Sequence, residues 1–258
     1  MIVKKKKKIG KIVLSILLML AAALIVNSIP AWNLKTDGMH EIDGNWIRVF
    51  YENENDAAND VFQLADAKAK QLADKFDFHE KQNITIYIYD HQSVMQRKKY
   101  GMIGPLLGLD WYIGDNIGTN VLLTSPANPG KVHSYDDNKD AVLHEMVHAY
   151  VSILNPDVKL WLTEGTALYL SNGEPFYKHD LKSRNIPSYK DIQTKNPITF
   201  SNMGGYAFAH TYIEYIDVTY GWDAVLDIIR TNDYEKVFGK TQKDIYMEWV
   251  SYLNNYYQ

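Results

Sequence analysis

The residues best suited to chemistry form the pentapeptide His144-Glu145-Met146-Val147-His148, inside a segment with a helical pattern from Lys139 to Leu154. Residues four apart on a helix share one face, so the two imidazoles can chelate a single metal ion. Zn²⁺ binds imidazole nitrogen at about 2.0–2.1 Å, and two side chains at this spacing can converge at that distance. Glu145 lies roughly 100° around the helix from His144. It can therefore approach a water molecule on the metal without taking a ligand position.

A catalytic zinc site usually has three protein ligands and one open position, so a third ligand must come from elsewhere. Glu164 is the candidate, 16 residues after His148, in the sequence Trp-Leu-Thr-Glu-Gly-Thr-Ala. The Asn155-Pro156 break lets the chain reverse, and Thr163 is expected to cap the next helix so that Glu164 projects from its first turn. The chain contains no cysteine, which limits metal ligands to histidines and carboxylates.

Each of these residues also has a purely structural interpretation. A His pair at this spacing is, by itself, more often two half-buried helix residues, and Glu164 alone could be a carboxylate favoured by a helix N-terminus. However, a chance HExxH in a chain with 8 histidines is an event of order 1%. The combination therefore favours a metal site. Asp140 could orient His144 or simply begin the helix, and His133 reads as part of a solvated loop.

The elements expected to position these residues are strands in the first half and helices in the second. This order indicates an α+β fold, in which a mixed β-sheet with helices precedes a mainly helical C-terminal part. Asp90 is expected to cap a helix that ends at Tyr100. Strands are expected at Trp46–Tyr51, Ile84–Tyr89, Leu109–Ile113 and Asn120–Thr124, the last two separated by a turn at 114–116. Helices are expected at Asp56–Phe76, Lys139–Leu154, Thr163–Ser171, Tyr206–Thr219, Trp222–Arg230 and Thr241–Tyr256, with loop-rich chain at 172–202.

The N-terminal segment differs from the rest of the chain. Lys4 to Lys8 and Lys11 precede the apolar stretch Ile12 to Val26, which indicates that residues 1–33 are a signal peptide or a membrane anchor. The lysines are expected to stay inside, so that residues 34–258 form one catalytic domain outside the cytosol, membrane-bound or secreted. Residues 12–258 carry 21 basic and 31 acidic side chains, a formal charge of about −10. Nucleic acid is therefore not an expected partner.

The His-Glu-Met-Val-His helix followed by Trp-Leu-Thr-Glu-Gly-Thr-Ala resembles the gluzincin branch of zinc peptidases, especially the peptidase MA-like families. The resemblance implies a thermolysin-like zincin core and one Zn²⁺ held by His144, His148 and Glu164, with Glu145 as catalytic base. It also implies that Asn120–Thr124 is the edge strand that pairs with an extended substrate.

The expected activity is hydrolysis of a peptide or protein substrate, in which zinc polarises the scissile carbonyl and Glu145 moves a proton from water to the leaving amine. Tyr206 or His210, one turn apart, is expected to stabilise the oxyanion. Two alternatives stay open at this point. The domain could be an exported binding or scaffold module without turnover, or it could hydrolyse a non-peptide amide of the cell wall.

Overall fold

The structure is a computed structural model that describes residues 2–171 and 176–257 of the chain. Residues 172–175 begin the stretch expected to be rich in loops, and they lie outside the described residues. The side chains of residues 2–10, which include Lys4 to Lys8, and of Lys178 are outside them too.

A five-stranded mixed sheet occupies the first half of the chain, as expected from the sequence. Its strands lie in the order β1-β2-β3-β5-β4. The pairs β2 with β3 and β3 with β5 are parallel, whereas β1 and β4 pair antiparallel with their neighbours. The strands are β1 (His40–Asp43), β2 (Ile47–Tyr51), β3 (Ile84–Tyr89), β4 (Gly114–Ile117) and β5 (Asn120–Thr124).

Helices cover both faces of this sheet. Ile84, Ile86 and Ile88 alternate along β3 and are fully buried on the face that packs against α2 (Asn55–Lys75) and α4 (Tyr135–Leu154). Tyr89 belongs to a smaller apolar cluster on the other face, together with Met95 of α3 (Gln92–Tyr100). Both faces of the central strand are therefore apolar, which is typical of parallel pairing in a covered sheet.

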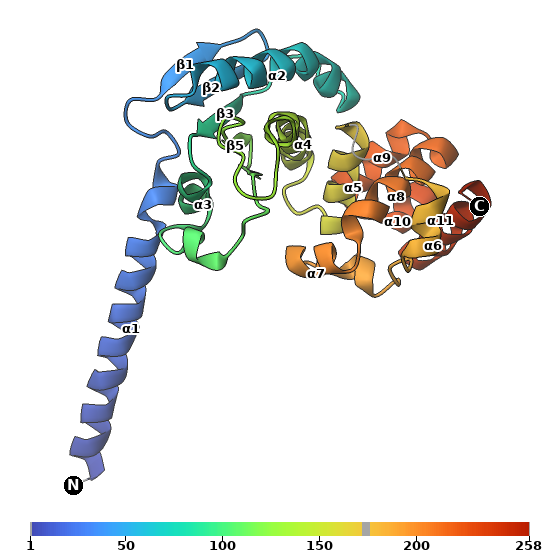
Figure 1. Cartoon of the computed structure of the whole chain (residues 1–258). Helices are drawn as coiled ribbons and strands as arrows, with labels where there is room; N and C mark the ends of the chain where they lie inside the picture. Colours follow the sequence, from blue (N-terminus) through green and yellow to red (C-terminus); the bar gives the residue numbers. More distant parts are fainter. Residues whose placement is uncertain (1, 172–175, 258) are drawn as a thin grey trace.

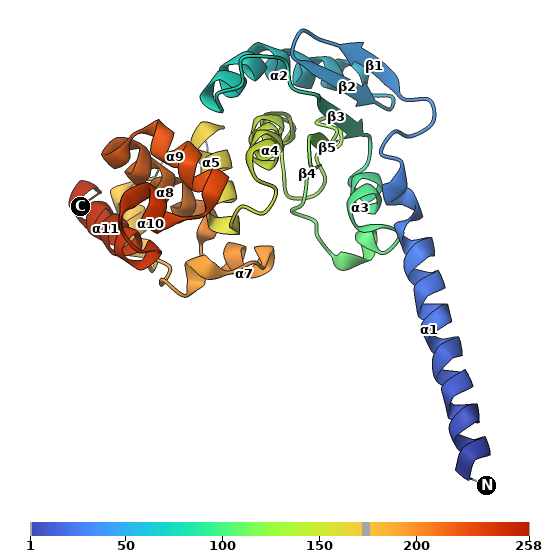
Figure 2. The ribbon, with the colours of Figure 1, turned by 180° about the vertical axis from the view of Figure 1, so that it is seen from behind.

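The second half of the chain is helical and forms a separate lobe beside α4 (Figures 1 and 2). Its centre is an aromatic cluster in which the rings of Trp161 and Trp249 lie 5.8 Å apart and are fully buried. The elements of this lobe are α5 (Leu160–Leu170), α6 (Lys178–Ser183), η2 (Asp191–Gln193), α7 (Pro197–Asn202), α8 (Gly205–Tyr220), α9 (Trp222–Thr231), α10 (Tyr234–Phe238) and α11 (Gln242–Tyr256).

The N-terminal segment is one long helix, α1 (Ile2–Trp32), which projects from the sheet lobe (Figure 1). Residues Lys11–Trp32 are long and apolar enough to cross a membrane, with a mean hydropathy of 2.6. No residue of this segment is fully buried against the rest of the protein. A membrane anchor and a signal sequence both have this character.

The hairpin next to α4 differs from the sequence-based prediction. Gly114-Asp115-Asn116 was expected to be a turn, but it lies in β4, and Leu109–Ile113 is not a strand. The turn is instead at Gly118-Thr119, because Ile117 pairs with Asn120 and Gly118 supplies the positive φ of 58° that a tight hairpin needs. Consequently β5 is an inner strand and β4 is the edge. The prediction that Asn120–Thr124 is the edge strand is wrong.

Two predicted helix caps are also wrong. Asp90 does not cap α3, because its carboxylate accepts hydrogen bonds from the backbone and side chain of Asn53. Thr163 does not cap α5, which begins at Leu160 after Lys159. The helix α4 begins at Tyr135, before the expected Lys139, because Ser134 and Asp137 form a capping box. The strand β1, the short helices α6, α7 and α10, and the 3-10 turns were not predicted.

Candidate metal centre

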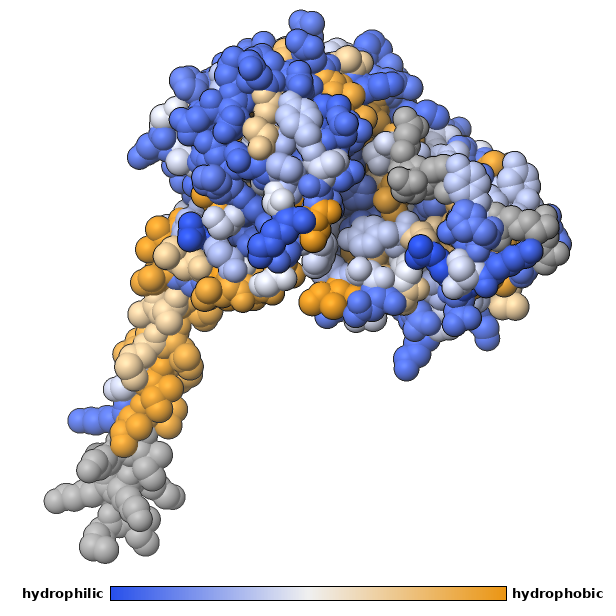
Figure 3. All heavy atoms as spheres, viewed as in Figure 1, coloured by the Kyte–Doolittle hydropathy of each residue, from blue (hydrophilic) through white to orange (hydrophobic). Residues whose placement is uncertain are grey.

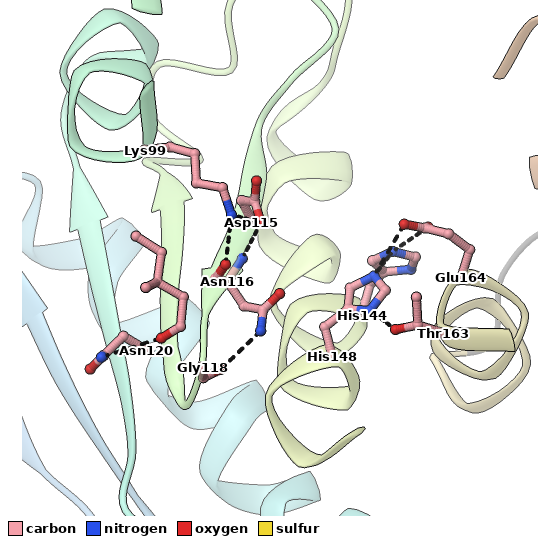
Figure 4. A network of polar contacts seen from close by, with 10 residues as sticks. Lys99, Asp115, Asn116, Gly118, Asn120, His144, His148, Thr163 and Glu164 are labelled. Carbon is pink, nitrogen blue, oxygen red and sulfur yellow. Dashed lines mark hydrogen bonds and ion pairs between the residues drawn. The ribbon is translucent and has the colours of Figure 1, made fainter. Parts of the chain in front are cut away.

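The two histidines of the pentapeptide lie on the face of α4 that points toward the helical lobe (Figure 4). Their Nε2 atoms are 3.0 Å apart, and the imidazole rings are nearly perpendicular with centroids 4.7 Å apart. Both side chains are mostly buried, His148 at 10% exposure and His144 at 19%. The helix therefore directs two imidazole nitrogens at one point, as the spacing predicts.

Glu164 reaches the same point from α5. Its Oε2 lies 3.5 Å from Nε2 of His144, and its Oε1 lies 3.7 Å from Nε2 of His148. One ligand atom from each of the three residues lies within 4.8 Å of the others. Because α5 begins at Leu160, Glu164 stands in the second turn of this helix and not in the first as predicted. The His/His/Glu group could hold a metal ion.

Thr163 has a role that the sequence did not suggest. Its Oγ1 lies 2.8 Å from Nδ1 of His148 (Figure 4). When Nδ1 carries the ring proton and donates a hydrogen bond to this hydroxyl, Nε2 of His148 keeps a free lone pair toward Glu164 and His144. Such a partner fixes the tautomer and the ring orientation of a metal-binding imidazole.

The chemistry of the donor set fits a divalent metal such as zinc. The Oε2 atom of Glu164 is buried and has no hydrogen-bond partner among the described residues. Burial would raise the pKa of Glu164, but the neighbouring imidazoles of His148 and His144 outweigh it and hold that pKa well below its usual range. An ionised, buried oxygen without a donor is costly unless a cation neutralises it. Two imidazoles and one carboxylate are also a known catalytic zinc set.

Glu145 occupies a distinct position on the same helix. It is 8% exposed and lies against β4, where a Cβ atom added to Gly114 would be 2.9 Å from its Cγ. Burial raises the pKa of Glu145 to about 8; the charge of His144 opposes this shift, and those of Asp115 and Glu164 add to it. A bound divalent cation would lower this pKa again. Glu145 is thus held tightly beside the centre without being one of the converging ligands.

An ion pair on the edge strand was missed by the sequence reasoning. Nζ of Lys99 lies 2.7 Å from Oδ1 of Asp115 and 2.8 Å from the carbonyl oxygen of Asn116 (Figure 4). Burial raises the pKa of Asp115, although Lys99 opposes the shift. The only feature of the sequence that could have indicated this ion pair was the acidic residue after Gly114, and an acidic residue at this position also fits a turn.

The two candidates for oxyanion stabilisation differ in position. Tyr206, in the first turn of α8, lines the cleft, and burial together with the charges of Glu164 and Glu145 raises its pKa well above the usual range. His210 is not among the cleft-lining residues of the described chain, and its ring packs against Phe176 at 6.0 Å. The structure thus places Tyr206 in the wall of the same cleft as the His/His/Glu group, whereas His210 is not among the described residues that line this cleft.

The remaining polar residues of this region have other partners. The carboxylate of Asp140 is 3.8 Å from Lys139, and His133 contacts the carbonyl oxygen of Trp111 at 2.9 Å. Asp137 belongs to the helix cap.

A cleft of about 900 Å³ runs between the two lobes above the centre. Its walls come from β4, from α4 with the histidines and Glu145, from α5 with Glu164, and from α7 and α8. The hollow between the lobes is visible in Figure 3. This volume is large enough for a segment of several residues, and His144, His148 and Glu164 line the cleft.

Comparisons with known proteins add little to this geometry. No family model matches the sequence, and no curated protein matches it. Among solved structures, native yeast LTA4 hydrolase is similar with a TM-score of 0.42 and 14% sequence identity. That match covers 83% of this chain, which spans only 36% of the yeast enzyme. A likeness this distant does not define a family, so the assignment of a function rests on the site itself.

Proposed function

We propose that this protein is an extracytoplasmic zinc-dependent peptidase that holds one Zn²⁺ with His144, His148 and Glu164. The observation that carries the proposal is the buried Oε2 of Glu164, which has no hydrogen-bond partner among the described residues while the carboxylate converges with two imidazole nitrogens. The resemblance to gluzincin and peptidase MA-like sequences supports the same ligand set and a thermolysin-like zincin core. One domain, residues 34–258, would carry the whole site.

A bound zinc ion would supply a Lewis acid that lowers the pKa of water and polarises a carbonyl group. The carboxylate of Glu145 would accept a proton from the attacking water and pass it to the leaving amine. Its burial against Gly114 limits its rotation, so it would need little reorganisation to do so.

Tyr206 would donate its hydroxyl proton in a hydrogen bond to the developing oxyanion. It is the better placed of the two predicted donors, because its side chain lines the cleft and that of His210 does not. A role for His210 would have to be indirect.

The edge strand β4 would take the substrate-pairing role first predicted for Asn120–Thr124. An edge strand offers unpaired backbone groups, to which an extended peptide can add as a further strand. Because Gly114 of β4 is in contact with Glu145, a peptide along this edge would run past the catalytic carboxylate. The expected substrate is therefore an extended polypeptide segment.

The location of this activity follows from the N-terminal segment. The lysine-rich start of α1 would stay on the cytoplasmic side, and the folded domain would lie outside. The acidic domain offers no argument for a nucleic-acid partner.

The test of this function is hydrolysis of a peptide library by the detergent-solubilised full chain. We expect cleavage that a chelator abolishes and added Zn²⁺ restores. The isosteric change Glu145→Gln should reduce kcat by roughly 10²–10⁴-fold, because it removes the general base. Zinc content should stay unchanged, since Glu145 is not a ligand. Zinc-loaded protein that cleaves no member of the library would instead support a binding module or a non-peptide substrate.

A further inference from the structure

The C-terminal end of α1 is built into the folded domain. Nδ2 of Asn27 donates to the carbonyl of Tyr100 at 3.2 Å, and its Oδ1 accepts from the backbone amide of Ile103 at 3.0 Å. The amide of Met102 donates to the backbone carbonyl of Asn27 at 2.9 Å. Gly101 packs so closely against Asn27 that any side chain there would collide with its backbone. These contacts hold α1 in a fixed relation to the loop that follows α3.

That loop exposes an unusual number of large apolar side chains. We call residues 102–107 the apolar loop; it includes the short turn η1 (Gly104–Leu107). Leu106 is 83% exposed, Met102 53%, Ile103 50% and Leu107 47%. Exposure of several large apolar side chains in one cluster is unfavourable in water. Figure 3 shows that the apolar surface of α1 continues onto the underside of the body.

The depth of the apolar loop along α1 fits a bilayer interface. The apolar part of α1, Lys11–Trp32, has 22 residues. At a rise of about 1.5 Å per residue it is about 33 Å long, close to the roughly 30 Å hydrocarbon core of a membrane. Asn27, which binds the loop, precedes the end of this segment by only five residues, or about 8 Å. Elements that lie in a membrane interface enter it by about 5–10 Å.

We propose that the apolar loop is a membrane-contact surface, inserted in the lipid interface beside α1, and that α1 is retained as part of the fold. Lipid is the occupant that the structure favours, because the loop is continuous with a helix whose own side chains need lipid. Removal of α1 up to Asn27 would break the bonds to Tyr100 and Ile103.

This arrangement would hold the cleft next to the membrane. Tyr100, the last residue of α3, accepts a hydrogen bond from Asn27 and also lines the cleft. On the other side of the cleft, α7 lies at the same lower end of the body as η1 in both views, and its Ile198 is 55% exposed (Figures 1 and 2). The inference itself depends on α1 and the loop, and not on the proposed peptidase activity.

The absence of cysteine from the chain allows a clean test. The full chain with Leu106→Cys is labelled with a nitrobenzoxadiazole fluorophore and reconstituted in vesicles of phosphatidylethanolamine and phosphatidylglycerol. The matched control is Val218→Cys on α8, which is 68% exposed and far from α1 in the sequence. Both positions tolerate a change, because both side chains are in contact with solvent.

We expect lipids with a shallow nitroxide to quench the label at 106 several-fold more than the label at 218. Aqueous iodide should show the reverse order. Met102→Cys provides a second position if the first variant is poorly produced. Equal iodide quenching at 106 and 218 would overturn the proposal. So would a label at 106 that is shielded from both quenchers, because a protein partner would then cover the loop.

Retention of α1 is tested by the intact mass of the chain purified from membranes. We expect a folded protein that still contains Asn27. A folded, released form that begins after Asn27 would contradict the proposal, whatever its hydrolytic activity.

Discussion

Two carboxylate clusters in the helical lobe differ in how well their oxygen atoms are satisfied by hydrogen bonds. Glu248 accepts hydrogen bonds from the hydroxyls of Tyr215 and Tyr220 at 2.7 and 2.8 Å and from Nζ of Lys240 at 2.6 Å. Glu164 is more deeply buried, with 14% against 37% of its side chain exposed, yet one of its oxygens has no hydrogen-bond partner among the described residues.

The less exposed carboxylate thus has the fewer hydrogen bonds, which is the reverse of what selection for stability alone would produce. A buried polar group is normally satisfied, and the need grows as exposure to water falls. In the Glu248 cluster, side chains of the protein donate hydrogen bonds to both carboxylate oxygens. In the Glu164 cluster, the proposed metal ion would be the partner of the oxygen that has no hydrogen bond from the described residues. The difference separates a carboxylate that holds the fold together from one that is arranged to bind a ligand.

The matched pair Glu164→Gln and Glu248→Gln tests this comparison and has the largest expected effects. Glu164→Gln should weaken zinc binding by more than about 100-fold and abolish hydrolysis, since it removes a ligand and its charge. It should also destabilise the metal-free protein, because it removes the charge that lies 3.5 Å from Nε2 of His144 and 3.7 Å from Nε2 of His148. Glu248→Gln should leave zinc binding unchanged and lower the free energy of unfolding by about 1 kcal/mol.

Zinc titration and thermal unfolding of the two variants measure these effects. Equal zinc affinity in the two variants would break the comparison.

The tyrosines of the two clusters provide a second, smaller contrast. Tyr206→Phe should lower kcat about 100-fold with little change in Tm, because its hydroxyl is needed only as charge develops on the substrate. Tyr215→Phe should lower Tm and leave kcat unchanged, since its hydroxyl already binds Glu248. Steady-state kinetics and thermal unfolding distinguish the two. A larger loss of kcat in His210→Asn than in Tyr206→Phe would reverse the proposed roles.

The pH dependence of stability gives the smallest effect and concerns Glu248. Its hydrogen bonds from Lys240 and Tyr215 lower the pKa of Glu248 to about 2, below its ordinary value of 4.5. A carboxylate with a lowered pKa stabilises the fold above its unfolded pKa, and this contribution is lost as the pH falls through the folded pKa. The Tm difference between metal-free wild type and Glu248→Gln should therefore be constant near neutral pH and shrink from about pH 4.5 toward 2. A difference that grows on acidification would contradict this assignment.

The sequence predicted the parts of the site that depend on local geometry. The spacing of His144 and His148 fixes their relation within one helix, and the break at Asn155-Pro156 correctly indicated that this helix ends before the one that carries Glu164. The mixed sheet followed by helices was also predicted correctly, because hydrophobic periodicity is a local property.

What could not be predicted depends on contacts between distant segments. Gly114-Asp115-Asn116 has the composition of a turn, but pairing with β5 and the ion pair to Lys99 make it an edge strand. Thr163 has the chemistry of a helix cap, and only the packing of α5 against α4 shows that it contacts His148. The proposed membrane contact of the apolar loop likewise depends on a distant segment, because Asn27 holds α1 beside the loop.

The most direct test of the metal centre is the zinc content of the full chain, purified without chelators and dialysed after incubation with Zn²⁺. We expect about one zinc ion per chain in the wild type and in Glu145→Gln, and much less than one in His144→Ala or His148→Ala. A wild-type protein without stoichiometric zinc, or a zinc content that survives the loss of both histidines, would contradict the account.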